Sequence, residues 1–293
     1  MFIKENTKMK NKLPQEKLRL TMVSWLILPL IGAWMTTGYL LGLAKNIIKR
    51  PEVLSSQMVN NCYEGVGSPV NGFEWDGSGL ITLWFDDGWY SQYSIAFPIL
   101  KEFGFVGALS VATGLVQGEK YMTWPQIKRL QANGWEITSH SVSHICDQNI
   151  LDNEKISYEL IESQKILRSY GLQAEHFVTP CGVSNSIIIE KAKEYYLSLR
   201  TAGEGLNLLP VNNPYELKIH AIRNNTSLEE VRQWIKEATL NRGWLIIVFH
   251  QIGEEGGTYE ASPQMFKDIL RLIKDSNLPV VLPSQALNVS IYR

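Results

Sequence analysis

Ile81-Thr82-Leu83-Trp84-Phe85-Asp86-Asp87-Gly88 is the stretch that decides the fold. Its apolar, β-prone part predicts a buried strand, and two adjacent carboxylates and a glycine follow directly. Two neighbouring acids repel each other and are costly to bury, so the arrangement indicates a compensating cation. Taken alone, the stretch is equally compatible with an exposed Asp-Asp-Gly turn.

Two further β-prone runs end in histidine. One run ends at Ser139 and leads into His140-Ser141-Val142-Ser143-His144, and the other, 244–249, is followed by His250. Side chains four residues apart on a helical turn share a face, so the first two imidazoles can converge on one ion. Parallel α/β folds place their chemistry at the carboxyl ends of strands. The three stretches therefore predict one site whose carboxylate and imidazole groups suit Zn²⁺ or a similar divalent ion.

In order and spacing, these three motifs resemble those of the polysaccharide deacetylase family, the NodB-homology carbohydrate esterases, over about residues 79–285. The resemblance implies an α/β fold, a distorted (β/α) barrel of about seven strands. It also implies removal of N-acetyl groups from a glycan. Asp86 would be the base that takes a proton from the attacking water, and His250 the acid that protonates the leaving amine. The implied ligands of a divalent metal, by default Zn²⁺, are Asp87, His140 and His144.

A fourth motif is only partly present. Phe177-Val178-Thr179-Pro180-Cys181-Gly182 has valine where the family has the arginine that orients the catalytic base, and cysteine where it has an aromatic residue. The Cys181 backbone N–H can still serve an oxyanion hole, because that role does not depend on the side chain. With valine at position 178, this motif contains no arginine that could orient Asp86. Arg200, at the end of a predicted strand, is a hypothesis for the replacement, and an ordinary surface arginine is its equal alternative.

The N-terminal region predicts a membrane anchor. Residues 1–19 are polar and lysine-rich, whereas residues 20–44 contain no charged side chain. That apolar run is long enough to cross ~30 Å of hydrocarbon as a helix and exceeds the ~7–15 residues of a cleavable signal core. We expect a basic cytoplasmic tail, an uncleaved single-pass signal anchor over 20–44 and a linker over 45–78. The alternatives are secretion after cleavage near Ala44 and a buried soluble helix.

Composition and cysteine spacing indicate which partners and which cysteine-based sites the protein is expected to lack. The chain of 293 residues has a formal net charge of −1, so no basic field indicates a nucleic-acid partner. Cys62, Cys146 and Cys181 form no CxxC pair and predict neither a zinc knuckle nor a disulfide framework. A bridge from Cys62 is possible if the domain lies outside the cytoplasm. We expect Cys181 to be a small buried thiol, and His176 and His220 to be surface or core residues.

Strand-like and helix-like segments alternate through the domain, which predicts a parallel sheet. The expected strands are 81–85, 106–111, 135–139, 176–179, 197–200, 218–222, 244–249 and 279–282. The expected helices are 91–103, one that begins after a Thr123 and Gln126 capping box, 153–170, 185–195, 228–240 and 263–275.

The leading functional hypothesis is a membrane-anchored, metal-dependent deacetylase of a cell-surface glycan that contains N-acetylglucosamine. Its domain would lie outside the cytoplasm, where such polymers are met directly. The missing arginine favours one alternative, a glycan-binding member of the same fold that is catalytically impaired. The other alternative is a metal-dependent amidase that acts on a small molecule or peptide.

Overall fold

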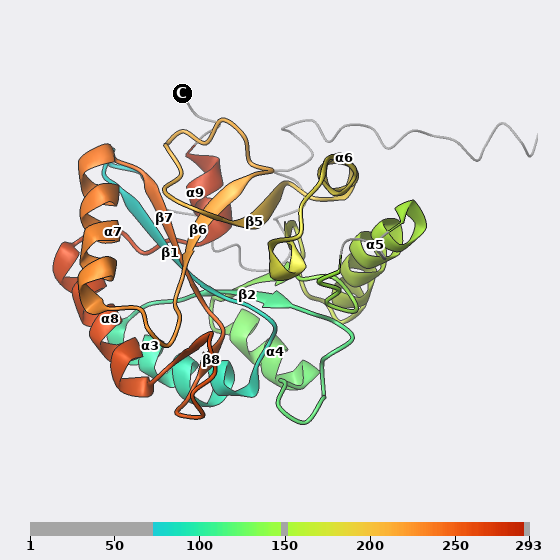
Figure 1. Ribbon diagram of the computed structural model, residues 1–293, viewed down its shortest axis with the longest axis horizontal. Coiled ribbons are helices and arrows are strands. Elements are labelled where there is room, and N and C mark those ends of the chain that lie inside the picture. The colour runs from blue at the N-terminus through green and yellow to red at the C-terminus, as the bar shows by residue number, and fades with distance from the viewer. Residues whose placement is uncertain (1–72, 148–151, 290–293) are drawn as a thin grey trace, which may run out of the picture. The chain divides into compact units, whose positions relative to one another are not determined.

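The computed structural model describes residues 73–147 and 152–289, which form a closed barrel of seven parallel strands (Figure 1). The strands follow the order of the chain, and β1 pairs with β7 to close the barrel. The expected α/β barrel of about seven strands is confirmed. The strands are β1 (Leu80–Phe85), β2 (Ala108–Val111), β3 (Glu136–Ser139), β4 (His176–Val178), β5 (Ser198–Glu204), β6 (Leu217–Ala221) and β7 (Trp244–Phe249).

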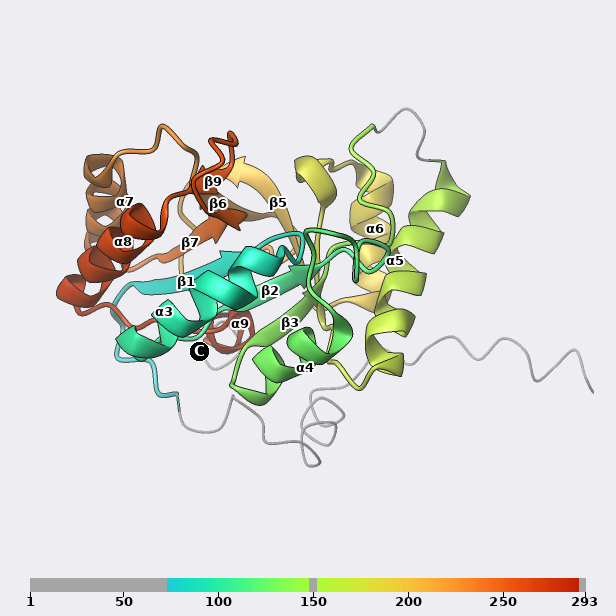
Figure 2. The same cartoon turned by 90° about the horizontal axis from the view of Figure 1, so that it is seen from below.

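Helices lie around the outside of the barrel (Figures 1 and 2). A short parallel pair, β8 (Gln251–Ile252) and β9 (Glu260–Ala261), follows β7. The helical segments are η1 (Gln92–Ala96), α3 (Phe97–Phe103), α4 (Trp124–Ala132), α5 (Asn153–Ser169), η3 (Pro180–Gly182), α6 (Ser186–Tyr195), α7 (Leu228–Asn241), α8 (Pro263–Ser276) and α9 (Pro283–Asn288). The expected capping box of Thr123 and Gln126 is present at the start of α4.

The strand expected over 279–282 is wrong. Val280 makes one isolated bridge to Ile81, and the chain then turns into α9. The barrel is already closed by β7, so an eighth strand has no position in it.

The N-terminal predictions fall largely outside the described residues. The tail, the anchor over 20–44 and most of the linker lie in residues 1–72. Within residues 73–147 and 152–289, no helix has the length and apolar character needed to cross a membrane.

The barrel interior is a packed core with paired polar atoms. Two fully buried tryptophans, Trp84 and Trp244, lie inside it. The indole N–H of Trp84 donates to the Ser110 hydroxyl at 2.7 Å, and that of Trp244 donates to the Thr82 hydroxyl at 2.9 Å. Buried indole groups need such partners, so the hydroxyls fix both rings.

Gln92 joins the ends of β1 and β7 at the site. Its buried amide donates hydrogen bonds to the Asp86 carbonyl at 2.6 Å and to the His250 carbonyl at 2.8 Å. One side chain therefore fixes the backbone of two residues that the sequence places in the site.

We expect Gln92→Leu to reduce the free energy of unfolding, because it leaves two carbonyls without their amide donor. A buried unsatisfied group costs about 1–3 kcal/mol. Urea unfolding monitored by circular dichroism measures the change. Gln264→Leu, at an exposed position of α8, is the matched control and should stay within about 0.5 kcal/mol of the parent. Equal losses in both variants would contradict the bridging role of Gln92.

Candidate active site

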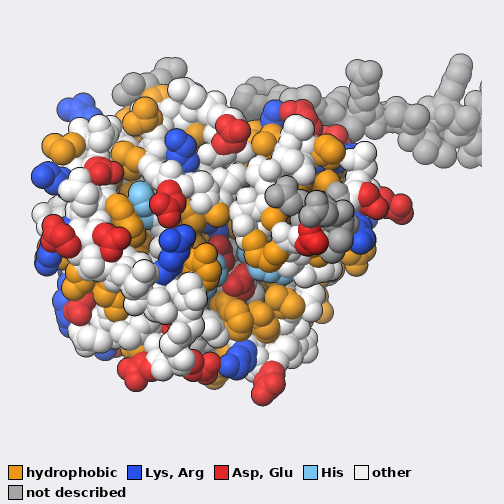
Figure 3. Space-filling model, in the orientation of Figure 1, with side chains coloured by type: hydrophobic (Ala, Val, Ile, Leu, Met, Phe, Trp, Pro, Cys, Tyr) orange, Lys and Arg blue, Asp and Glu red, His pale blue; other side chains and the backbone are white. Residues whose placement is uncertain are grey.

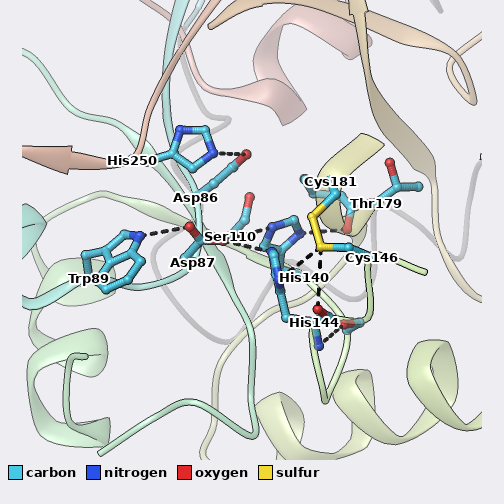
Figure 4. Close-up of polar contacts among 12 residues, drawn as sticks. Asp86, Asp87, Trp89, Ser110, His140, His144, Cys146, Thr179, Cys181 and His250 are labelled. Atoms are coloured by element: carbon cyan, nitrogen blue, oxygen red, sulfur yellow. Dashed lines mark hydrogen bonds and ion pairs between the residues drawn. A yellow bond between two sulfur atoms is a disulfide. The ribbon is translucent and has the colours of Figure 1, made fainter. Parts of the chain in front are cut away.

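In the turn after β1, the adjacent side chains of Asp86 and Asp87 point in different directions (Figure 4). Asp87 has φ 76° and Gly88 has φ 82°, so the backbone is left-handed at both positions. A non-glycine residue adopts this conformation at a cost that surrounding contacts must offset. As a result, the Asp86 carboxylate contacts Arg200 of β5, whereas the Asp87 carboxylate faces the segment after β3.

Asp87 meets both histidines of the second motif. Its Oδ1 lies 3.3 Å from Nε2 of His140 and 3.0 Å from Nε2 of His144. The other ring nitrogen of His140, Nδ1, lies 2.8 Å from the Val178 carbonyl oxygen, which can only accept a hydrogen bond. That contact places a proton on Nδ1 and turns Nε2 of His140 toward Asp87.

These three side chains fit a divalent cation. Asp87 Oδ1 is buried and accepts no hydrogen bond with acceptable geometry from any described residue. The ligand atoms of Asp87, His140 and His144 all lie within 4.8 Å of one another. One carboxylate oxygen and two imidazole nitrogens are a usual donor set for Zn²⁺. A cation between them would satisfy an oxygen that otherwise lacks a partner.

The protonation of this cluster follows from its contacts. Burial raises the pKa of Asp87, but its close contacts with His140 and His144 and their charges outweigh burial and hold that pKa well below its usual range. Burial lowers the pKa of His144, but the Asp87 carboxylate outweighs it and the net shift is upward. Asp87 therefore stays ionised, as a metal ligand must be.

Arg200 lies against Asp86 and is not a surface arginine. It is 1% exposed, and its guanidinium donates to Oδ1 of Asp86 at 2.7 Å and to Oδ2 at 2.5 Å. The guanidinium carbon also lies 5.0 Å from the ring centroid of Trp84. Burial raises the pKa of Asp86, but Arg200, with smaller contributions from His140 and His250, lowers it below its ordinary value. Asp86 is therefore ionised and fixed in orientation.

His250, which follows β7, completes the group. Its Nε2 lies 3.9 Å from Oδ2 of Asp86. Burial lowers the pKa of His250, and the charges of Asp86 and Asp87 offset this only in part. The neutral imidazole is thus favoured at rest. The ring of Tyr259, from the loop before β9, lies beside it with centroids 4.9 Å apart.

The segment that carries His144 is fixed by buried polar contacts. Glu159 of α5 accepts hydrogen bonds from the backbone N–H groups of Val142 and Ser143, both at 2.8 Å. The Ser141 hydroxyl accepts from the His144 N–H at 3.0 Å. Ser141 and His144 both have left-handed φ, which indicates a conformation imposed by these contacts.

The turn after β4 differs from the sequence prediction. Cys181 is exposed and forms a disulfide with Cys146, so the expectation of a small buried thiol is wrong. Cys62, considered above for a bridge, lies outside the described residues. Gly182 is required here, because it has φ 70° and an added Cβ would lie 2.4 Å from the Cβ of Ala202. The turn is closed by hydrogen bonds from the N–H groups of Gly182 and Val183, which leave the Cys181 N–H outside these two bonds.

The remaining histidines lie elsewhere. His176 is buried at the start of β4, where it contacts Glu136 at 2.9 Å and the Ser198 hydroxyl at 2.8 Å. His220 is half-buried and stacks on Trp234. Both are thus core or surface residues, as expected.

Trp89 is an unexpected contributor to the site. Its indole N–H donates to Oδ2 of Asp87 at 2.8 Å, and its ring stacks on Tyr121 with centroids 4.5 Å apart. The hydrogen bond holds one Asp87 oxygen and leaves the other toward the histidines. The position of Trp89 directly after Gly88 is the only sequence signal for this contact.

The site opens to solvent. In the space-filling view, acidic and histidine side chains lie in a central hollow, and apolar side chains line its lower edge (Figure 3). The exposed aromatic residues of the described chain include Tyr90 and Tyr259, which are 47% and 46% exposed.

Comparison with known proteins confirms the resemblance found in the sequence. Residues 76–199 match the family model described as polysaccharide deacetylase. The chain is 26% identical to a gellan lyase of a Bacillus species over 202 residues, 62% of this chain and 8% of the lyase. It is 24% identical over 115 residues to YxkH of Bacillus subtilis, a protein provisionally named a polysaccharide deacetylase; the match covers 39% of this chain and 41% of YxkH. The chain therefore spans less than half the length of either relative.

A solved structure shares the fold. The T48 deacetylase, solved with substrate, superposes with a TM-score of 0.54 at 18% identity, covering 74% of this chain and 94% of that one.

We expect Trp89→Phe to weaken cation binding, because it keeps the aromatic ring and removes the N–H that holds Asp87. Loss of a group that orients a metal ligand costs about 10-fold in affinity. Zn²⁺ titration against a competing chelator measures the change. Tyr121→Phe keeps the stacked pair and is the matched control, with unchanged affinity. Parent-like affinity in Trp89→Phe would show that the indole N–H does not orient Asp87.

Proposed function

Because residues 76–199 match the family model described as polysaccharide deacetylase, we propose that this protein is a metal-dependent hydrolase. It removes N-acetyl groups from a glycan that contains N-acetylglucosamine. One observation carries the proposal: Asp87 Oδ1 faces two imidazole nitrogens beside a second, arginine-paired carboxylate. This arrangement combines a cation site with a fixed base, as amide hydrolysis requires.

Asp87, His140 and His144 would hold the cation, which we propose to be Zn²⁺. When bound, it supplies Lewis acidity toward the amide carbonyl and makes water a better nucleophile near neutral pH. Three protein ligands leave coordination positions open, as in other catalytic sites. The Trp89 and Val178 contacts keep Asp87 and His140 in the orientation that binding needs.

Asp86 is assigned as the base. Arg200 lowers the pKa of its carboxylate, which keeps it ionised, and fixes its orientation. The carboxylate is ready to accept a proton from the attacking water, and the guanidinium of Arg200 stays charged throughout. Arg200 thus supplies the function of the arginine that is absent at Val178, which argues against the catalytically impaired alternative.

His250 is assigned as the acid. Its imidazole lies on the other side of Asp86 from the disulfide-linked turn, where a leaving amine can reach it (Figure 4). Because burial lowers its pKa, the proton that His250 delivers has to be acquired during the reaction. The Cys181 N–H, which lies outside the two hydrogen bonds that close its turn, is a candidate donor to the developing oxyanion.

The aromatic rings around the site, of which Tyr259 is exposed and Trp89 and Tyr121 are half-buried, favour a sugar substrate over a small amide. Tyr259 lies beside the acid, and Trp89 with Tyr121 lies beside a metal ligand. Sugars present apolar ring faces that pack on aromatic side chains. An open hollow with aromatic residues on two sides suits a polymer chain better than a closed pocket would.

We propose that the domain works outside the cytoplasm, on an anchor formed by residues 20–44, with the tail and linker assigned above. The uncharged length of that segment supports the anchor. The Cys146–Cys181 disulfide supports an oxidising compartment.

The test is acetate release by the Zn²⁺-loaded full-length chain on N-acetylglucosamine oligomers and peptidoglycan. We expect release by the parent and loss in two variants for different reasons. Asp86→Asn should keep the cation and lose the base, whereas His140→Ala should lose the cation. No acetate from any glycan, with one cation still bound per chain, would overturn the proposal.

We expect Arg200→Lys to lower kcat roughly ten- to hundredfold while cation affinity stays unchanged. Lysine keeps the charge but lacks the planar guanidinium that lies against the Trp84 ring and fixes the nitrogen that contacts both Asp86 oxygens. Arg232→Lys, at an exposed ion pair on α7, is the matched control. An unchanged kcat in Arg200→Lys would show that the guanidinium does not position the base.

A further inference from the structure

The disulfide joins two segments that both contribute to the site. Cys146 lies two residues after His144, and Cys181 lies in η3, directly after β4 (Figure 4). The Sγ atom of Cys146 lies 3.9 Å from Nδ1 of His144. The covalent link is therefore next to a proposed metal ligand, on the ring edge that faces away from Asp87.

Of the two segments that the disulfide joins, the turn that contains Cys181 is the more rigid, because it is held against β5. The Thr179 N–H donates to the Arg200 carbonyl at 3.0 Å, and Gly182 packs directly on Ala202 of β5. The same segment supports the other imidazole, because the Val178 carbonyl binds Nδ1 of His140. β4 and η3 thus orient His140 by a hydrogen bond and the His144 segment by a covalent bond.

The His144 segment has room to move without the link. Ile145, between the ligand and the cysteine, lines a small apolar cavity together with Leu160, Pro180 and Val183. Upstream, the segment is held by Glu159 and by the Thr113 and Gly114 N–H groups, which donate to the carbonyls of residues 141 and 142. Together with the bond from the His144 N–H to the Ser141 hydroxyl, these contacts hold the segment up to His144, and the disulfide restrains it beyond that residue.

We propose that the Cys146–Cys181 disulfide is a redox-sensitive positioning element that sets the cation affinity of the Asp87, His140 and His144 site. Both cysteines are exposed, so a dithiol can reach the bond. A dithiol breaks the sulfur–sulfur bond by supplying two electrons and two protons. It becomes a disulfide, and two protein thiols form. His140 and Asp87 keep contacts that do not pass through sulfur, so affinity falls while the barrel stays folded.

The inference deepens the proposed function but is tested on cation binding, which needs no substrate. Full-length protein is titrated with Co²⁺ in three states: oxidised, reduced with dithiothreitol and desalted, and reoxidised. We expect about 10-fold weaker binding after reduction and recovery on reoxidation. Because free thiols can themselves bind Co²⁺, the Cys146→Ala/Cys181→Ala variant is measured in parallel and should match the weakened affinity without a thiolate–cobalt absorption band.

Two controls separate positioning from stability. Cys62→Ser removes the remaining cysteine of the chain and should leave affinity unchanged, with no free thiol before reduction. Urea unfolding reports the stability of each form. The inference is overturned if the double alanine variant binds Co²⁺ like the parent, including the case where only its stability falls. It is also overturned if the oxidised chain contains three free thiols. Binding loss without glycan turnover by any form would remove the proposed function and leave this inference standing.

Discussion

The site depends on one buried ion pair, Asp86 with Arg200, in the mouth of the barrel. Removing two charges from water costs on the order of several kcal/mol per ion, and their attraction offsets this only when the geometry is good. Here both carboxylate oxygens meet the guanidinium, whose face lies over the Trp84 ring. With Asp86 fixed in this way, the left-handed turn at Asp87 directs the second acid to the opposite side. The two carboxylates therefore hold different partners although they are neighbours in the chain.

Because Asp86 and Asp87 have separate partners, the charges at the mouth of the barrel are balanced pairwise. One carboxylate is neutralised by a permanent cation of the chain, and the other faces two imidazoles that a divalent ion would complete. Two acids facing the same group would raise each other's pKa values. Separate partners keep both ionised, which suits one for proton transfer and the other for metal binding. The left-handed residues Asp87, Ser141, His144 and Cys181 all lie here, so backbone strain is concentrated at the site.

The pattern of β-prone runs followed by polar residues was enough to predict which side chains meet at the site. Asp86, Asp87, His140, His144 and His250 all follow strands, and parallel strands bring their carboxyl ends together. Their roles in catalysis and metal binding stay predictions. The same reasoning offered Arg200 only as a hypothesis equal to a surface arginine, and it placed the strand end wrongly, since β5 continues to Glu204. The pairing of Arg200 with Asp86, 114 positions away, appears only in the structure.

What local pattern could not supply were contacts between distant segments. The Cys146–Cys181 disulfide spans 35 residues, and Gln92 reaches a carbonyl 158 positions away. Neither has a periodic signal, because each depends on how loops pack on a finished barrel. The false strand at 279–282 has the same origin. Its residues are β-prone, but they pair with β1 only at Ile81, on the edge opposite β7, before the chain turns into α9.

The ends of the described domain have an architectural consequence. Phe73 and Val289 both pack near the starts of the strands, in the cluster with Leu80 and Trp244, whereas the site lies where the strands finish. Ser284 of α9 binds Glu136 at the first residue of β3, which fastens the final helix to that same face. Other polypeptide can therefore be joined at either end without crossing the mouth of the barrel. A barrel connected in this way keeps the same open mouth whatever the length of the polypeptide on either side, so the geometry of the site is independent of the size of the protein that carries it.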